Sequence, residues 1–146
     1  MALPKQIDAR GPRFGAAITT VVLAVAFLSI GTPLATALLV LQTIVFGIGA
    51  IAGPHVQPYG ILFAKVVKPR LAPATKFEAP QPPRFAQAVG LGFAVAALVG
   101  IVAGLEILTT IAVGFAFAAA FLNAVFNFCL GCEMYLLIRR FTASAA

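Results

Sequence analysis

Four long apolar runs dominate this sequence and restrict what it can fold into. They cover approximately residues 14–30, 34–52, 85–103 and 107–138. An α-helix rises about 1.5 Å per residue and the hydrocarbon core of a bilayer is about 30 Å thick, so each run is long enough to cross a membrane. The content of 62% hydrophobic residues and the mean hydropathy of +1.06 lie far outside the range of soluble domains. The sequence therefore predicts an integral membrane protein surrounded by a lipid bilayer.

The breaks between these runs predict how the helices are paired. Residues 31–33 and 104–106 are short turns, so the runs form two helical hairpins. As a single helix, the fourth run would be about 48 Å long, well beyond the hydrocarbon core. We therefore expect this run to break at residues 127–131.

Each hairpin is followed by a short segment that suits the membrane surface. Lys65 and Lys68 interrupt the apolar residues of 61–70, which predicts a short amphipathic helix. The Pro-rich residues 71–83 predict an extended linker. The expected fold is a single all-α membrane domain over residues 1–146. It has four transmembrane helices in two hairpins, each followed by a short cytoplasmic interfacial helix.

The basic residues predict the orientation in the membrane. They precede the first run, separate the second from the third, or follow the fourth: Lys5, Arg10, Arg13, Lys65, Lys68, Arg70, Lys76, Arg84, Arg139 and Arg140. Lys and Arg are enriched in cytoplasmic loops. We therefore expect a multi-pass protein of the inner or plasma membrane with both termini in the cytoplasm. The basic residues flank apolar runs and are not interleaved with stacking aromatic residues, so no nucleic-acid partner is expected.

A recurring segment indicates an internal repeat. Pro-Arg-Phe at residues 12–14 returns at residues 83–85, a shift of 71 residues that also relates glycines and basic residues further along. The halves, about residues 12–70 and 83–141, would be parallel repeats related by a pseudo-twofold axis along the membrane normal. The alternative is that any two hairpins rich in Ala, Val, Leu and Gly align this well.

Cys129 and Cys132 are the only cysteines of the chain and the strongest candidates for chemistry. In the register of the repeat they correspond to Pro58 and Ile61, so reactivity would have been added to one copy of a scaffold. We expect them at the start of the last short helix, on the cytoplasmic face. There the backbone dipoles favour a thiolate, while the like charge of Glu133 opposes it.

Three interpretations of the cysteine pair stay open. In the first it is a dithiol that carries electrons or sulfur, because this spacing lets the sulfurs meet in a disulfide. A permanent structural disulfide is not expected in the reducing cytoplasm. In the second, Cys129 and Cys132 bind a metal ion together with His55 and Glu133. In the third, the cysteines are inert residues that pack a helix crossing.

Other polar residues inside the runs predict contacts between helices. Asn123 and Asn127 are four residues apart and are expected to share a helix face. Hydrogen bonding to a neighbouring helix is the preferred interpretation, and lining of a cavity is the alternative. The same applies to Gln42, Thr43, Thr109 and Thr110. The runs carry no charged residue near their centres, which argues against a proton relay.

Three segments carry a resemblance to a known family: residues 128–135 (Phe-Cys-Leu-Gly-Cys-Glu-Met-Tyr), residues 10–14 and residues 82–85. With these segments, nearly the whole chain resembles a family of small bacterial membrane proteins catalogued as domain of unknown function 4395. The resemblance implies no established activity. Members of the family are often encoded beside thioredoxin-like and thiosulfate sulfurtransferase proteins, which favours thiol or sulfur chemistry.

Three functions therefore stay open. The first is a dithiol of Cys129 and Cys132 at the cytoplasmic face that exchanges electrons or sulfur with a thioredoxin-like or sulfurtransferase partner. The second is a non-enzymatic accessory subunit of a larger membrane complex. The third is a transporter of small solutes or sulfur compounds, which would need a homo-oligomer. Whether the protein is an enzyme is undecided, with the balance against it, and no cofactor is expected.

Overall fold

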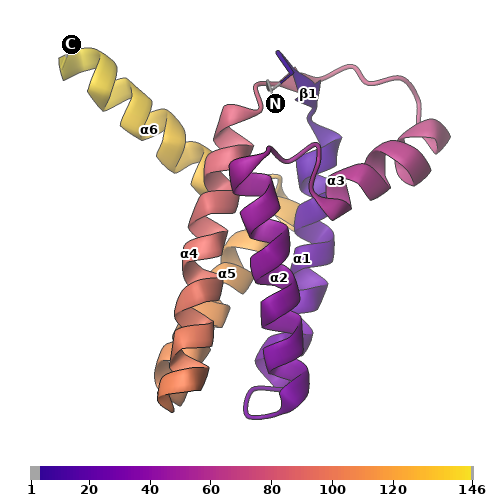
Figure 1. Cartoon of the computed structure of the whole chain (residues 1–146). Helices are drawn as coiled ribbons and strands as arrows, with labels where there is room; N and C mark the ends of the chain where they lie inside the picture. Colours follow the sequence, from indigo (N-terminus) through magenta and orange to yellow (C-terminus); the bar gives the residue numbers. More distant parts are fainter. Residues whose placement is uncertain (1–3, 146) are drawn as a thin grey trace.

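Four long helices in two hairpin-like pairs form the body of the protein (Figure 1). The computed structural model describes residues 4–145. Helices α1 (Arg10–Leu28) and α2 (Pro33–Ile51) form the first pair, and α4 (Gln81–Ala103) and α5 (Glu106–Phe126) form the second. All four are long and apolar enough to cross a membrane. The prediction of an all-α fold with four spans in two hairpins is confirmed.

The first helix of each pair begins four residues earlier than its apolar run. Pro12 and Pro83 consequently lie in the first turns of α1 and α4. A proline is tolerated there because the amide N–H groups of a first turn have no acceptor within the helix. The apolar pattern located the hydrophobic part of each helix and missed its polar first turn.

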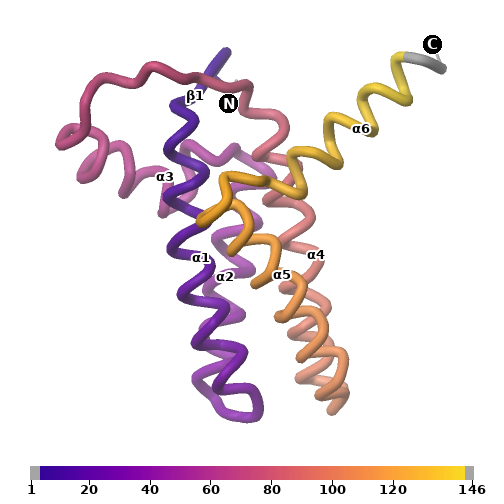
Figure 2. Tube along the Cα trace, turned by 180° about the vertical axis from the view of Figure 1, so that it is seen from behind, coloured from indigo at the N-terminus to yellow at the C-terminus, as the bar shows by residue number. Residues whose placement is uncertain are grey.

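Short helices follow both pairs, at the end of the bundle where the termini lie (Figure 1). We call this end the terminal end. After α2, helix α3 (Pro58–Leu62) continues through a π-helical segment, η1 (Phe63–Val67), and a 3-10 turn, η2 (Lys68–Arg70). After α5, helix α6 (Leu130–Ala145) leaves the bundle obliquely, as Figure 2 shows from behind.

The expected break in the fourth run is confirmed between α5 and α6. Asn127 caps the end of α5 in the left-handed conformation, with φ of 53°. Asn is one of the few residues other than Gly that adopt this conformation readily. The prediction that Asn123 and Asn127 share a helix face is wrong, because the helix has ended where Asn127 begins the turn.

A two-residue strand pairing ties the predicted linker to the start of the chain. Strand β1 (Ile7–Asp8) runs antiparallel to β2 (Phe77–Glu78). The buried Asp8 accepts hydrogen bonds from the backbone N–H of Arg10 (3.0 Å) and from its guanidinium (2.8 Å). Arg10 also donates to the carbonyl oxygen of Ala72 at 3.1 Å. The linker is therefore held at its middle, and such a short pairing leaves no periodic signal in a sequence.

The second helix of each pair packs against the first helix of the other pair, α2 on α4 and α5 on α1. The core between them is rich in small residues such as Ala26, Ala97 and Ala112, which let membrane helices approach closely. Thr109 of α5 donates to the carbonyl oxygen of Ala97 of α4 at 3.0 Å, an interhelical bond of the predicted kind. Thr43 instead donates to the carbonyl oxygen of Leu39 in its own helix.

Two arginines cap the C-terminal ends of α5 and α2 in the same way. Arg13 of α1 donates from Nε to the carbonyl oxygen of Ala124 (3.1 Å), near the end of α5. Arg84 of α4 donates from Nε to the carbonyl oxygen of Ala50 (2.7 Å), near the end of α2. The last four carbonyl groups of a helix lack partners within it, and a cation also complements the dipole there. The recurring Pro-Arg-Phe segment thus makes equivalent contacts in the two halves.

Candidate functional site

Cys129 and Cys132 form a disulfide at the start of α6, with their Cα atoms 5.1 Å apart. Cys129 directly precedes the helix, and its carbonyl oxygen accepts the backbone N–H of Glu133 at 3.0 Å. The backbone N–H of Cys132 donates to the sulfur of Cys129 at 3.1 Å. The sulfur therefore takes the place that a Ser, Thr or Asp oxygen takes at a helix N-cap.

This geometry makes the two cysteines chemically different. A helix N-terminus carries partial positive charge and stabilises a nearby thiolate. The sulfur of Cys129 lies at that terminus with an N–H group directed at it, whereas Cys132 is already within the first turn. The carboxylate of Glu133 is exposed. Cys129 is therefore the better placed of the two to hold negative charge.

The position of the cysteine pair is set by the crossing of α6 over α4. At the closest point a Cβ on Gly131 would lie 2.5 Å from the Cβ of Ala86, so no larger residue fits between the helices. One turn further along α6, the rings of Tyr135 and Phe85 are 5.8 Å apart. The glycine between the two cysteines is thus required by packing.

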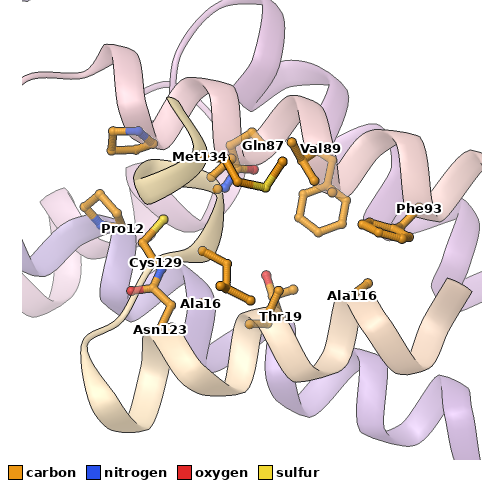
Figure 3. A pocket seen from close by; sticks show the side chains of 18 of the residues that line it. Pro12, Ala16, Thr19, Gln87, Val89, Phe93, Ala116, Asn123, Cys129 and Met134 are labelled. Carbon is orange, nitrogen blue, oxygen red and sulfur yellow. The ribbon is translucent and has the colours of Figure 1, made fainter. Parts of the chain in front are cut away.

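A cavity of about 240 Å³ lies beside the disulfide, between α1, α4, α5 and α6. Figure 3 shows Cys129 and Asn123 toward one end of its lining and Phe93 and Ala116 toward the other. Its walls are mostly alanine, aromatic and aliphatic side chains. The polar groups among them are Thr19, Gln87, Asn123 and the sulfur of Cys129.

Gln87 is the least satisfied of these polar groups. Its Oε1 is buried and has no hydrogen-bond partner among the residues that the structure describes. The side chain is held against α2, where a Cβ on Gly49 would lie 2.7 Å from that oxygen. Sequence reasoning overlooked both Gln87 and Thr19. The signal that could have identified Gln87 is a lone amide within an apolar run.

The residues of the metal alternative are not brought together. His55 lines a separate cavity of about 230 Å³ with Asp8 and Lys68, away from Cys129. Within residues 4–145, no three His, Cys, Asp or Glu side chains lie close enough to hold a metal ion. The physical reason is that α3 packs on α1 while α6 packs on α4, which separates the loop of His55 from the cysteines.

The position equivalent to Cys129 in the first half is occupied by an amide. The short helices begin at Pro58 and Leu130, so their N-caps are Gln57 and Cys129, one residue away from the sequence register that pairs Pro58 with Cys129. Gln57 is only 2% exposed. The ring of Phe63 lies 5.7 Å from that of Phe14, which matches the ring pair of the second half.

Comparison with known proteins identifies the family. No curated protein and no solved structure matches the chain. One protein-family model does, over residues 7–140, a range that contains both arginine contacts, both short helices' N-caps and the cysteine pair. The resemblance seen in the sequence is confirmed, and the chain belongs to the family described as Domain of unknown function (DUF4395).

Proposed function

We propose that Cys129 and Cys132 are a reversible dithiol–disulfide pair at the cytoplasmic surface of the membrane, which exchanges electrons or sulfur with a thioredoxin-like or sulfurtransferase protein. The observation that carries the proposal is the hydrogen bond from the backbone N–H of Cys132 to the sulfur of Cys129. It supports Cys129 as the attacking thiolate and Cys132 as the resolving thiol.

The exchange with a partner disulfide balances in two steps. The thiolate of Cys129 attacks one partner sulfur, so a mixed disulfide forms and the other partner sulfur leaves as a thiolate. The thiolate of Cys132 then attacks the sulfur of Cys129, and the second partner sulfur leaves. The partner gains the two electrons and two protons that the cysteine pair loses.

The charge distribution supports a cytoplasmic site. All ten Lys and Arg residues belong to segments at the terminal end, the same end that carries the disulfide (Figure 1). The positive-inside tendency of membrane proteins places such an end in the cytoplasm. Cys129 and Cys132 are half-buried at this end. A disulfide in the cytoplasm meets thiol-reducing proteins, which suits a pair that cycles.

The test is trapping of a mixed disulfide. A thioredoxin whose resolving cysteine is replaced by Ser, and whose remaining cysteine is activated as a mixed disulfide with thionitrobenzoate, is mixed with the reduced, purified protein in detergent. Attack by a cysteine of the protein on the thioredoxin sulfur then releases thionitrobenzoate as the leaving group. In Cys132→Ser the thiolate of Cys129 has no internal partner, so we expect it to accumulate the mixed disulfide, whereas Cys129→Ser forms little. The double variant is the control for folding and for thiol-independent binding.

Two results contradict the proposal. Equal trapping by the two single variants removes the distinct roles of the cysteines. Cysteines that resist alkylation until the reduced protein is denatured are packing residues and not a dithiol site. For the wild-type pair we expect a reduction potential between about −220 and −280 mV, between the glutathione pool and thioredoxin.

A second candidate function is an accessory subunit of a larger membrane complex, and α6 is the observation that favours it. This helix leaves the bundle (Figure 2). Its side chains Leu137, Ile138 and Phe141 are exposed. Such a face covers either lipid headgroups or another protein. Extraction in mild detergent discriminates, because a subunit co-purifies with stoichiometric partners.

A further inference from the structure

We infer that the cavity beside Cys129 binds the ring of a lipid-soluble quinone, which accepts the electrons of the Cys129–Cys132 dithiol. This inference rests on the proposed function. It names the oxidant that returns the pair to the disulfide form after a dithiol partner has reduced it, by the reverse of the exchange described above.

The size and the walls of the cavity suit a substituted quinone ring. An apolar cavity of about 150 Å³ is enough to hold benzene. The cavity here measures about 240 Å³, which leaves room for ring substituents. Phe46, Phe93 and Phe115 line it, and flat aromatic walls favour a flat ring.

The polar groups of the cavity match the two redox forms of such a ligand. A quinone presents two carbonyl acceptors, and a hydroquinone presents two hydroxyl donors. The amide of Asn123 supplies both a donor and an acceptor, and the hydroxyl of Thr19 does the same. The Oε1 of Gln87 is packed against Gly49 of α2 and takes no part in this match.

The depth of the cavity favours an oxidant that arrives through the membrane. Its lining follows α4 from Pro83 to Phe93, about 15 Å of helix, from the terminal end into the apolar span. Cys129 lies toward the terminal end of this path. A water-soluble oxidant gains nothing from an apolar chamber of this length, whereas a quinone partitions into the bilayer that surrounds it.

The reaction balances without a further reagent. The thiolate of Cys129 adds to a ring carbon of the quinone, which forms a carbon–sulfur bond. The thiolate of Cys132 attacks that sulfur, so the sulfur–sulfur bond forms, the carbon–sulfur bond breaks and its electron pair passes to the ring. The two thiol protons end on the two ring oxygens. The products are the disulfide and one hydroquinone.

The experiment uses the full chain, reduced with dithiothreitol, desalted under anaerobic conditions and mixed with decylubiquinone in detergent. We expect the loss of two alkylatable thiols for each quinone reduced, followed by quinone absorbance and by mass shift. Ala120→Trp, which fills the cavity from α5, should slow the reaction roughly tenfold or more, since misplacement of a reacting group costs that much. Ile111→Trp, on the exposed face of the same helix, is the matched control and should react like wild type.

The outcomes separate this inference from the proposed function. A dithiol that exchanges with thioredoxin but is not oxidised by decylubiquinone overturns the quinone site alone. Equal rates for Ala120→Trp and Ile111→Trp also overturn it, as does a phospholipid that native mass spectrometry finds bound and that excess quinone does not displace. A dithiol inert to both thioredoxin and quinone overturns the inference and the proposed function together.

Discussion

Two helix crossings at the terminal end are built on one plan, and only one of them carries a disulfide. In the first crossing α3 packs on α1, and the small residue is Gly15 on the long helix, whose added Cβ would lie 3.7 Å from the Cβ of Tyr59. In the second crossing α6 packs on α4, and the small residue is Gly131 on the short helix, against Ala86. When the helix starts are aligned, Tyr59 and Gly131 occupy equivalent positions.

The small residue lies on the long helix in the first crossing and on the short helix in the second. This difference changes what each crossing encloses. Tyr59 fills the first crossing, and its hydroxyl donates to Oε1 of the buried Gln42 at 2.9 Å. Gln42 in turn donates to the hydroxyl of Thr19 at 3.3 Å. In the second crossing Gly131 contributes no side chain, and the cavity beside Cys129 occupies that region. The same arrangement of helices therefore encloses a chain of hydrogen-bonded polar side chains in the first half and a cavity in the second half.

The largest effect is expected from Gly131→Ala. Its Cβ would overlap with Ala86, including the Cα of Ala86 at 2.6 Å, so α6 must move away from α4. Overpacking of this kind costs about 3 kcal/mol, and we also expect faster alkylation of the reduced cysteines as the crossing opens. Thermal unfolding in detergent and alkylation rates measure the two effects.

Gly15→Ala is the matched control in the first crossing. Its Cβ would meet the nearest atoms at 3.6 and 3.7 Å, which are ordinary contacts. Alanine is also the better helix former by about 1 kcal/mol, so the variant should be as stable as wild type or more stable. Equal destabilisation by the two substitutions would show that the two crossings are packed alike, which contradicts the comparison.

An intermediate effect is expected from Tyr59→Phe. The substitution leaves Oε1 of the buried Gln42 without its donor, which costs about 1 to 2 kcal/mol. Tyr135→Phe is the control, because the ring of Tyr135 packs on Phe85 while no hydrogen bond of its hydroxyl is found within residues 4–145. Unfolding of the two variants in the same detergent compares them. Similar losses would mean that the hydroxyl of Tyr59 does not distinguish the crossings.

The sequence predicted the helices better than it predicted the site. Spans, hairpins and the break before α6 follow from the length of the apolar runs, because a bilayer imposes that length on any spanning helix. The cysteines were identified from their spacing alone. The capping of α6 by Cys129, the unsatisfied amide of Gln87 and the exchange of Tyr59 for Gly131 all depend on where helices cross, and crossing points are set by tertiary packing.

The smallest effect concerns the antiparallel pairing of β1 with β2, which we call the clip. It borders the first crossing and has no counterpart beside Cys129 among the described residues. The hydrogen bonds from Arg10 lower the pKa of Asp8 below its ordinary value of 3.8, while burial raises the pKa of Glu78 above 4.5. A lowered pKa stabilises the clip above pH 3.8, and this is lost as the pH falls through the folded value. A raised pKa has the opposite effect, because the folded state then favours the protonated carboxyl. Acidification from neutral pH therefore first raises the stability of the clip, as Glu78 takes up a proton.

Stability of the clip should therefore pass through a maximum just above pH 4 and then fall, by under about 1 kcal/mol for a partly exposed ion pair. Hydrogen exchange of the Ala9 amide, which donates to the carbonyl oxygen of Lys76 at 3.2 Å, reports on it after correction for the intrinsic rate at each pH. Asp8→Asn should remove the fall on the acid side, and Glu78→Gln should remove the rise that precedes it. A clip whose protection stays flat from pH 7 to pH 3 in the wild type would show that these two carboxyls do not hold it. The first crossing would then be held by the hydrogen bond between Tyr59 and Gln42 alone.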